Sequence, residues 1–230
     1  SRNAVLVQGK DLSRAEHYEA NSENLTELVK NFADYQIRRD NLTTQRRQLL
    51  RQKDEIADSL LTKLQGMDTL GNPPFDSVLL PAGGSELKRI APLFAFFDVD
   101  PSRVKLLGTT LWDETADLSL EPALVGAWYV APAPKGVSEF TEKFKKHYGY
   151  KPPRLATLGY DAMLLAAALS QTTHSDEHPA FDIHDPRGFI GVDGIIRLLP
   201  NGTNERGYAV IEVGKSGPLV VDDAPLKFLY

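Results

Sequence analysis

The segment FDSVLLPAGGSELKRIAPLFAFFDVDPSRVKLLGT, residues 75–109, decides the fold class of this chain. Residues 75–80 form a short, nearly continuous apolar run, which is typical of a strand covered on both faces of a parallel sheet. A Pro-Ala-Gly-Gly turn follows, then a helical pattern over 85–97, a turn at Asp100-Pro101 and a second apolar run at 104–107. Strands that alternate with helices over short connections indicate a parallel sheet with crossover helices.

The flanking sequence extends this α/β pattern in both directions. Residues 125–130 (VGAWYV) predict a third strand of the same kind, and residues 14–19 predict a weaker first strand. Apolar residues at helical spacing predict helices at 25–32 and 137–148, and a further helix at 155–170 is apolar on almost every side. A helix of that last kind is normally buried, so we expect it to pack against other protein.

The C-terminal region predicts antiparallel strands instead. Asn201-Gly202 and Ser216-Gly217 are the strongest hairpin signals in the chain, and apolar runs of strand type flank both pairs. We therefore expect β-hairpins after the α/β region.

Residues 36–65 form a long polar stretch without proline or glycine. Its apolar residues are sparse, so the pattern predicts a long helix or helical hairpin that projects from the body, is mostly exposed and is dispensable for folding. Acidic residues lie close to its five arginines, which favours a solvated helix face, with a surface for a partner protein as the second interpretation. The apolar residues spaced by seven are Leu42, Leu49 and Ile56, and the arginines are Arg38, Arg39, Arg46, Arg47 and Arg51.

Composition narrows the function classes. A net charge of -5 over 230 residues argues against binding to a nucleic-acid backbone. The absence of cysteine excludes disulfides and thiol nucleophiles. No apolar run reaches the roughly 18 residues of a transmembrane helix, and residues 1–20 lack the pattern of a signal peptide.

The sequence offers little support for catalysis. It contains no GxSxG elbow, no HExxH helix and no Ser, His and Asp set at recognisable spacing. His174, His178 and His184 lie among acidic residues in the polar segment 171–186, but on no rigid element at the spacing of metal ligands, which favours a solvated loop. We expect no enzyme activity, no metal and no cofactor.

The candidate ligand site lies at the carboxyl ends of two predicted strands, where open α/β sheets bind ligands. The first loop leads into a helix whose N-terminal N–H groups can face an anion, although plain helix capping explains it equally. The second loop carries a tryptophan, which can form a pocket wall or shield the end of the sheet. The candidate residues are Ala82, Gly83, Gly84 and Ser85 in the first loop, and Thr109, Thr110, Trp112 and Asp113 in the second.

Two motifs carry a resemblance to a known family. LGYDAMLLAAAL (158–169) followed by GFIGVDGII (188–196) resembles the type I periplasmic binding proteins of the leucine-binding class. Residues 68–113, with the charged helical segment before them, resemble the penicillin-binding-protein activator lipoproteins, which share that fold. The resemblance covers most of the chain.

The resemblance implies a function and a location. It implies a non-catalytic receptor-like domain in the periplasm that regulates peptidoglycan synthesis through contact with a peptidoglycan synthase, anchored by a lipidated N-terminus that lies outside this sequence. The alternative is the solute-binding component of an ABC importer for amino acids or related small molecules. The loop 108–112 lacks the carboxylate with which amino-acid binders of the class hold the ligand ammonium, and Asp113 and Glu114 are displaced from that position.

The resemblance also implies a domain plan. Residues 1–132 correspond to the second lobe with the helical insertion 36–65, residues 133–186 to a helical segment that packs on the first lobe, and residues 187–230 to strands that return to the second lobe. The first lobe lies outside this sequence. We therefore expect residues 155–170 either to contact another copy or a missing fragment, or to leave an exposed apolar patch.

Overall fold

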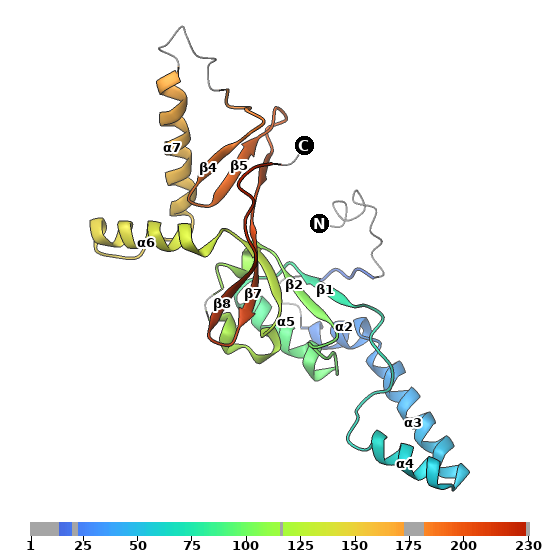
Figure 1. Ribbon diagram of the computed structural model, residues 1–230. Coiled ribbons are helices and arrows are strands. Elements are labelled where there is room, and N and C mark those ends of the chain that lie inside the picture. The colour runs from blue at the N-terminus through green and yellow to red at the C-terminus, as the bar shows by residue number, and fades with distance from the viewer. Residues whose placement is uncertain (1–13, 20–22, 116, 173–181, 229–230) are drawn as a thin grey trace. The chain divides into compact units, whose positions relative to one another are not determined.

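A computed structural model describes residues 14–19, 23–115, 117–172 and 182–228 (Figure 1). The strands form a five-stranded sheet in the order β1-β2-β3-β7-β8 and a three-stranded sheet in the order β4-β5-β6. The larger sheet is mostly parallel, is flanked by helices and ends in antiparallel strands, which confirms the predicted α/β class. The chain divides into two compact units: residues 1–107 with 117–127, and residues 108–116 with 128–230.

The first unit contains the segment that decided the fold class. Its described elements are α2 (Leu25–Phe32), α3 (Tyr35–Gln52), α4 (Glu55–Leu64), β1 (Ser77–Leu80), α5 (Gly84–Phe96), most of β2 (Lys105–Gly108), and the short 3-10 helices η2 (Leu118–Leu120) and η3 (Pro122–Leu124). The predicted strands 75–80 and 104–107 and the helix between them are therefore confirmed.

Helix α5 supplies much of the core of this unit. Leu87, Ile90 and Phe94 recur at helical spacing on one face and are all buried. Helix α2 packs on α5, and the Phe32 ring centroid lies 4.9 Å from that of Phe75 and 6.3 Å from that of Phe94. The apolar spacing in the sequence thus specifies both helices and the faces that they bury.

The predicted strand at residues 14–19 is wrong, because this segment has no strand pairing. Its Arg14 side chain caps the end of α2 instead: Nη1 donates to the carbonyl of Phe32 at 2.7 Å and lies 2.9 Å from Oδ1 of Asp34. The last carbonyls of a helix have no hydrogen-bond donor within the helix, and this guanidinium supplies one to the end of α2.

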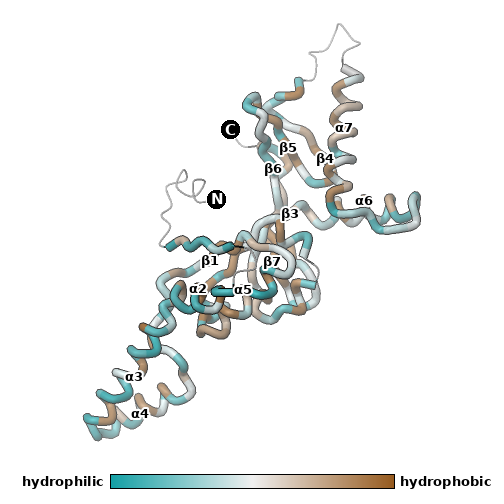
Figure 2. Tube along the Cα trace, turned by 180° about the vertical axis from the view of Figure 1, so that it is seen from behind, coloured by the Kyte–Doolittle hydropathy of each residue, from teal (hydrophilic) through white to brown (hydrophobic). Residues whose placement is uncertain are grey.

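The polar stretch 36–65 is a helical hairpin of α3 and α4, as predicted, and most of its residues are exposed. Figure 2 shows how hydrophilic residues dominate α3. A small core of its own holds the hairpin together, formed by Leu42, Leu49, Ala57 and Leu64. Ile56 does not continue the predicted spacing of seven and is 73% exposed. The first helix ends at Gln52, and the new helix α4 buries Ala57 instead.

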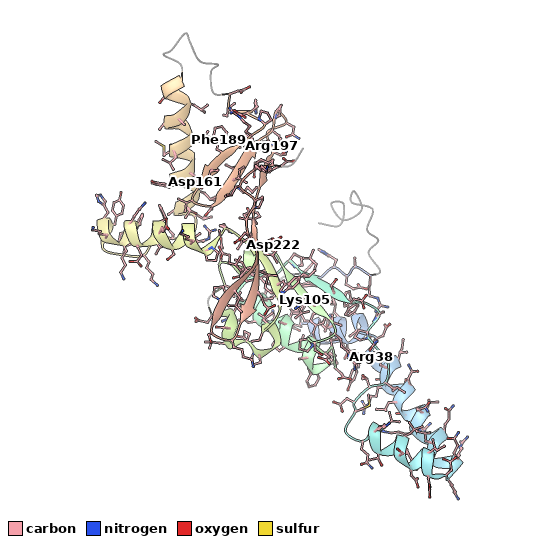
Figure 3. All side chains as sticks on the ribbon, in the orientation of Figure 1. Arg38, Lys105, Asp161, Phe189, Arg197 and Asp222 are labelled. Carbon is pink, nitrogen blue, oxygen red and sulfur yellow. The ribbon has the colours of Figure 1, made fainter. Side chains whose placement is uncertain are left out.

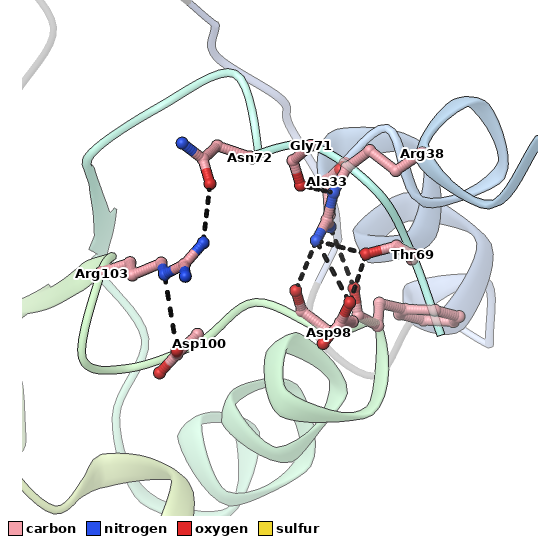
Figure 4. Close-up of polar contacts among 9 residues, drawn as sticks. Ala33, Arg38, Thr69, Gly71, Asn72, Asp98, Asp100 and Arg103 are labelled. Carbon is pink, nitrogen blue, oxygen red and sulfur yellow. Dashed lines mark hydrogen bonds and ion pairs between the residues drawn. The ribbon is translucent and has the colours of Figure 1, made fainter. Parts of the chain in front are cut away.

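Arg38 contradicts the interpretation of the arginine run as a solvated face. It is only 5% exposed, and its guanidinium reaches three segments of the first unit (Figure 4). Six acceptor atoms share its five N–H donors, so it keeps none for a ligand. The acceptors are the carbonyls of Gly71 (3.1 Å), Ala33 (3.5 Å), Phe97 (3.3 Å) and Asp98 (2.7 Å), Oγ1 of Thr69 (2.8 Å) and Oδ2 of Asp98 (3.5 Å).

The charges near Arg38 moderate the cost of its burial. Burial lowers the pKa of the guanidinium, while the charges of Asp98 and Asp34 act in the opposite direction. Arg46 also has a structural role, since its Nη2 donates to the carbonyl of Leu64 at 2.6 Å at the end of α4. The remaining arginines of the run, Arg39, Arg47 and Arg51, are exposed as predicted.

The second unit combines helices with two antiparallel arrangements of strands. Its described elements are η1 (Thr110–Trp112), β3 (Trp128–Ala131), α6 (Pro134–Tyr148), α7 (Ala156–Thr172), β4 (Phe189–Gly191), β5 (Gly194–Leu198), β6 (Asn204–Arg206), β7 (Ala209–Gly214) and β8 (Gly217–Asp222). Strand β7 pairs antiparallel with β3, and Nε1 of Trp128 donates to the Glu212 carboxylate at 2.9 Å across this pair. Among the described residues, no helix is long and apolar enough to cross a bilayer.

Both predicted hairpins are confirmed. Strands β5 and β6 pair across the Asn201-Gly202 turn, and β7 and β8 pair across the Ser216-Gly217 turn. Strand β4 was not predicted, and it forms a further hairpin with β5 through Val192-Asp193. Gly194 follows that turn with a φ of 91°, a conformation that favours glycine.

The substitution Arg38→Met tests the structural role of the buried guanidinium. We expect it to lower the free energy of unfolding by about 3–5 kcal/mol, because buried acceptors lose their donors. Arg39→Met, on the exposed neighbour, should change it by less than about 0.5 kcal/mol. Urea unfolding followed by circular dichroism measures both, and equal effects of the two substitutions would contradict this role.

We predict that the outer part of the hairpin is dispensable for folding, provided that Arg38 is retained. The Leu70 amide donates to the Arg38 carbonyl at 2.9 Å, so the two ends of the hairpin lie side by side. Replacing residues 42–66 with a short Gly-Ser linker should therefore preserve a single cooperative thermal transition. Loss of cooperativity would show that the hairpin belongs to the core.

Candidate functional site

The first predicted ligand loop lies between β1 and α5. Ala82 is buried, Gly83 is the N-cap of α5, and Ser85 is exposed. Gly84 has a φ of 55°, so this position favours glycine. The carboxylate of Glu86 occupies the first turn of α5, where the helix dipole stabilises negative charge.

The Glu86 carboxylate makes the first loop a poor site for an anion. Its Oε2 accepts a hydrogen bond from Arg89 at 3.1 Å, while Oε1 is buried without a hydrogen-bond partner among the described residues. Burial raises the pKa of Tyr18, and the charge of Glu86 adds to that rise. The Glu86 carboxylate already supplies a negative charge at the N-terminal turn of α5, and it would repel a bound anion.

The second predicted loop belongs to the other unit, and Trp112 dominates its packing. The Trp112 side chain is completely buried, and its ring centroid lies 6.1 Å from that of Tyr129. A Cβ atom at Gly108 would lie only 2.2 Å from the indole, so the strand end can accept this ring only with glycine there. Trp112 therefore fills the end of the strand. Thr109 caps η1, its Oγ1 accepting a hydrogen bond from the Leu111 amide at 3.4 Å.

Asp113 is held by Arg154, which the sequence analysis did not single out. The Arg154 Nε donates to Oδ2 of Asp113 at 2.7 Å. Its Nη1 donates to Oγ1 of Thr157 at 2.7 Å and to Oδ1 of Asp193 at 3.2 Å. The Thr157 hydroxyl in turn donates to Oδ2 of Asp193 at 3.0 Å. One guanidinium thus connects the loop after β2, the start of α7 and the β4–β5 turn.

Arg154 stays charged in this network. Burial acts to lower the pKa of its guanidinium, but the hydrogen bond and charge of Asp113 and the charge of Asp193 outweigh burial, so the pKa is raised. Asp193 is almost completely buried, and its carboxylate needs this cation and the Thr157 hydroxyl.

Asp161 forms the second connection between α7 and the β4–β5 turn (Figure 3). Its carboxylate accepts hydrogen bonds from the backbone amides of Val192 at 2.7 Å and Asp193 at 3.1 Å. A Cβ atom at Gly191 would lie 2.4 Å from this carboxylate, so glycine is required for the close approach. The two motifs that carried the family resemblance, GYDA and GVDG, are therefore in direct contact.

A polar cavity of about 410 Å³ opens beside Arg38 in the first unit. Arg103 extends across its rim, and its Nη1 donates to Oδ1 of Asn72 at 3.1 Å (Figure 4). The two arginines of the lining are balanced by Asp98 and Asp100. Hydrogen bonds from the Ser102 side chain and from the Ser102 amide lower the pKa of the Asp100 carboxyl group. These charged groups already satisfy one another.

Helix α7 leaves most of its apolar surface uncovered. Of residues 156–170 only Thr157 is buried, while Leu155 is 66% exposed and Met163 is 70% exposed. Figure 2 shows the hydrophobic central turns of this helix. These exposures are those of the single chain, so the contact of residues 155–170 with another copy or a missing fragment stays a prediction.

The histidine-rich linker falls largely outside the described residues, which exclude His174 and His178. His184 is described, and its Nδ1 lies 3.3 Å from the carbonyl of Leu198. Nearby, the Asp185 carboxylate pairs with Arg187 at 2.7 Å. Within the part of the chain that the structure describes, no group of three or more acidic or histidine side chains is arranged to hold a metal.

No protein-family model and no curated protein matches this chain. The chain is similar to solved structures of an extracellular ligand binding receptor from Desulfohalobium retbaense (22% identity, TM-score 0.45), the leucine-binding protein LivK from Thermotoga maritima (22%, 0.43) and the C-domain of LpoA from Haemophilus influenzae, a regulator of PBP1A (13%, 0.45). These alignments cover 74%, 73% and 74% of this chain and 29%, 47% and 59% of the others. The chain thus spans less than two thirds of each.

The eight residues predicted to contact a ligand belong to two different units. Ala82 to Ser85 lie in the first, and Thr109 to Asp113 lie in the second. Their role in ligand binding stays a prediction. The sequence analysis did not assign roles to Arg154, Thr157, Asp161 and Asp193, although the GYDA and GVDG motifs contain two of them.

Substitution of Asp161 tests the connection between the two motifs. Asp161→Ala should lower the free energy of unfolding by about 2–3 kcal/mol, because the Val192 and Asp193 amides lose a charged acceptor. Asp161→Asn keeps one acceptor oxygen and should cost less. Exposed Asp223→Ala is the control, with an expected change below about 0.5 kcal/mol in the same urea titration. An effect of Asp161→Ala no larger than that of the control would contradict the connection.

Proposed function

We propose that this chain is part of a non-catalytic, receptor-like protein of the periplasm that regulates peptidoglycan synthesis by contact with a penicillin-binding protein. The exposed apolar surface of α7 is the observation that carries the proposal. Full burial of one exposed Leu or Met side chain contributes about 1.5–3 kcal/mol, so covering such a surface with another protein is favourable.

Hydrogen bonds hold the first turns of α7, which suits a protein contact. Asp161 and Arg154 connect its first turns to the β4–β5 turn and to Asp113. A partner that covers Met163 and Leu164 would therefore meet a helix that needs little ordering on binding. The sequence resemblance to penicillin-binding-protein activators supports the choice of partner.

The alternative function is solute binding for an importer. The second loop supports it less, because Trp112 has no exposed surface and the Asp113 carboxylate is already bound by Arg154. Thr110 and the first loop, around Gly83, remain the candidate contacts for a small ligand.

A capture experiment distinguishes the two functions. The purified chain is immobilised and exposed to a purified class A penicillin-binding protein, and Met163→Glu with Leu164→Glu should weaken capture at least tenfold. Both side chains are exposed, so the variant should still fold. Leu50→Glu with Ile56→Glu, at two exposed apolar positions on the α3–α4 hairpin, should leave capture unchanged.

Two results would overturn the proposal. One is the absence of any capture of the penicillin-binding protein by the native chain. The other is a stoichiometric heat of binding for leucine or benzoate in isothermal titration, together with capture that does not depend on α7. The second result would support solute binding instead.

A further inference from the structure

The end of α6 concentrates positive charge on an otherwise acidic chain. Residues 143–151 read KFKKHYGYK, with four lysines and no acidic residue, although the net charge of the whole chain is -5. All four lysines are exposed. None of them has a carboxylate within 4.0 Å among the described residues, whereas Arg89, Arg154 and Arg197 all form ion pairs.

Aromatic rings cluster among these lysines. The ring centroid of Phe144 lies 4.5 Å from that of Tyr148 and 5.4 Å from that of Tyr150. Gly149 ends the helix with a φ of 81°, and the chain reversal brings Tyr150 back against Phe144. Tyr148 and Tyr150 are nevertheless each 58% exposed. Two exposed tyrosines thus lie in the same short segment as four exposed lysines.

The helix dipole explains only part of this arrangement. Lys145 and Lys146 lie in the last turn of α6, where the helix dipole favours cations. Lys151 lies beyond the helix end, and the dipole gives no reason for two exposed tyrosines. Glu142 lies beside three of these lysines but within 4.0 Å of none of their ammonium groups, so an anionic partner would relieve the repulsion that remains among the four charges.

We propose that residues 143–151 bind an anionic phospholipid surface. Lysine is a compact point charge that suits a diffuse array of phosphates, whereas specific recognition of carboxylates favours the bidentate fork of arginine, which this surface lacks. Exposed tyrosines have an apolar ring and a polar hydroxyl, which suits the interface between headgroups and acyl chains. This inference goes beyond the proposed function and does not depend on it.

Vesicle co-sedimentation of the full chain tests the proposal. The chain should bind vesicles of phosphatidylcholine and phosphatidylglycerol but not vesicles of phosphatidylcholine alone, and added salt should weaken binding. The triple variant K143E/K145E/K146E should lose more than about 100-fold in affinity, since each basic residue contributes roughly fivefold at such a surface. If that variant melts at a lower temperature than the native chain, K143Q/K145Q/K146Q provides the same test with less repulsion at the helix end.

The variant R39E/R47E/R51E is the matched control. It makes the same change in charge at three exposed positions of α3, which lack an aromatic cluster and belong to a hairpin that also carries Asp40, Asp54, Glu55 and Asp58, and it should bind the anionic vesicles as the native chain does. Y148A/Y150A should weaken the binding that persists at high salt. These two results would support a specific surface with an aromatic component.

Three results would overturn the inference. They are equal loss of binding in the α3 control, no difference between the two kinds of vesicle, and binding to a soluble acidic polymer such as polyglutamate without binding to vesicles. The last result would assign the surface to an acidic macromolecule instead of a membrane. None of these results depends on capture of a penicillin-binding protein, so the two proposals fail separately.

Discussion

The carboxylate of Asp161 accepts hydrogen bonds from two consecutive backbone amides in the β4–β5 turn, and the arrangement of the second unit depends on this contact. The buried carboxylate of Asp193 follows at once in that turn, and Arg154 and Thr157 neutralise it. Thr157 and Asp161, near the start of α7, thereby connect a helix with an apolar middle to this turn. Because charged hydrogen bonds of this kind are strongly directional, the rest of α7 can stay uncovered and still keep a defined position.

The arginines show how burial decides the role of a charged residue. Arg38 and Arg39 are neighbours in the sequence, yet the first has six internal acceptor atoms and the second faces solvent. Arg154 lies between these extremes, with two carboxylates around a partly exposed guanidinium. A guanidinium has five donors in a planar fork, so it can join several segments of chain at once where a lysine would leave acceptors unsatisfied.

The second unit carries two surfaces of different character. Helix α7 is apolar and bare, while the end of α6 is basic and aromatic. The two helices contact each other where the ring centroids of Phe140 and Tyr160 lie 5.2 Å apart. An apolar surface favours a protein partner that excludes water, and a basic surface favours a partner that keeps its charges hydrated. The same unit therefore offers separate places for two kinds of interaction.

The sequence by itself determined the α/β class, the helices of both units and the two hairpins at Asn201-Gly202 and Ser216-Gly217, because apolar periodicity and turn chemistry are local properties. It also predicted that the apolar helix at residues 155–170 needs a cover. Only the tertiary structure decided that residues 14–19 form no strand, that Arg38 is buried and that Arg154 binds Asp113. Those outcomes depend on which distant carbonyls and carboxylates reach a given side chain, and no local pattern contains that information.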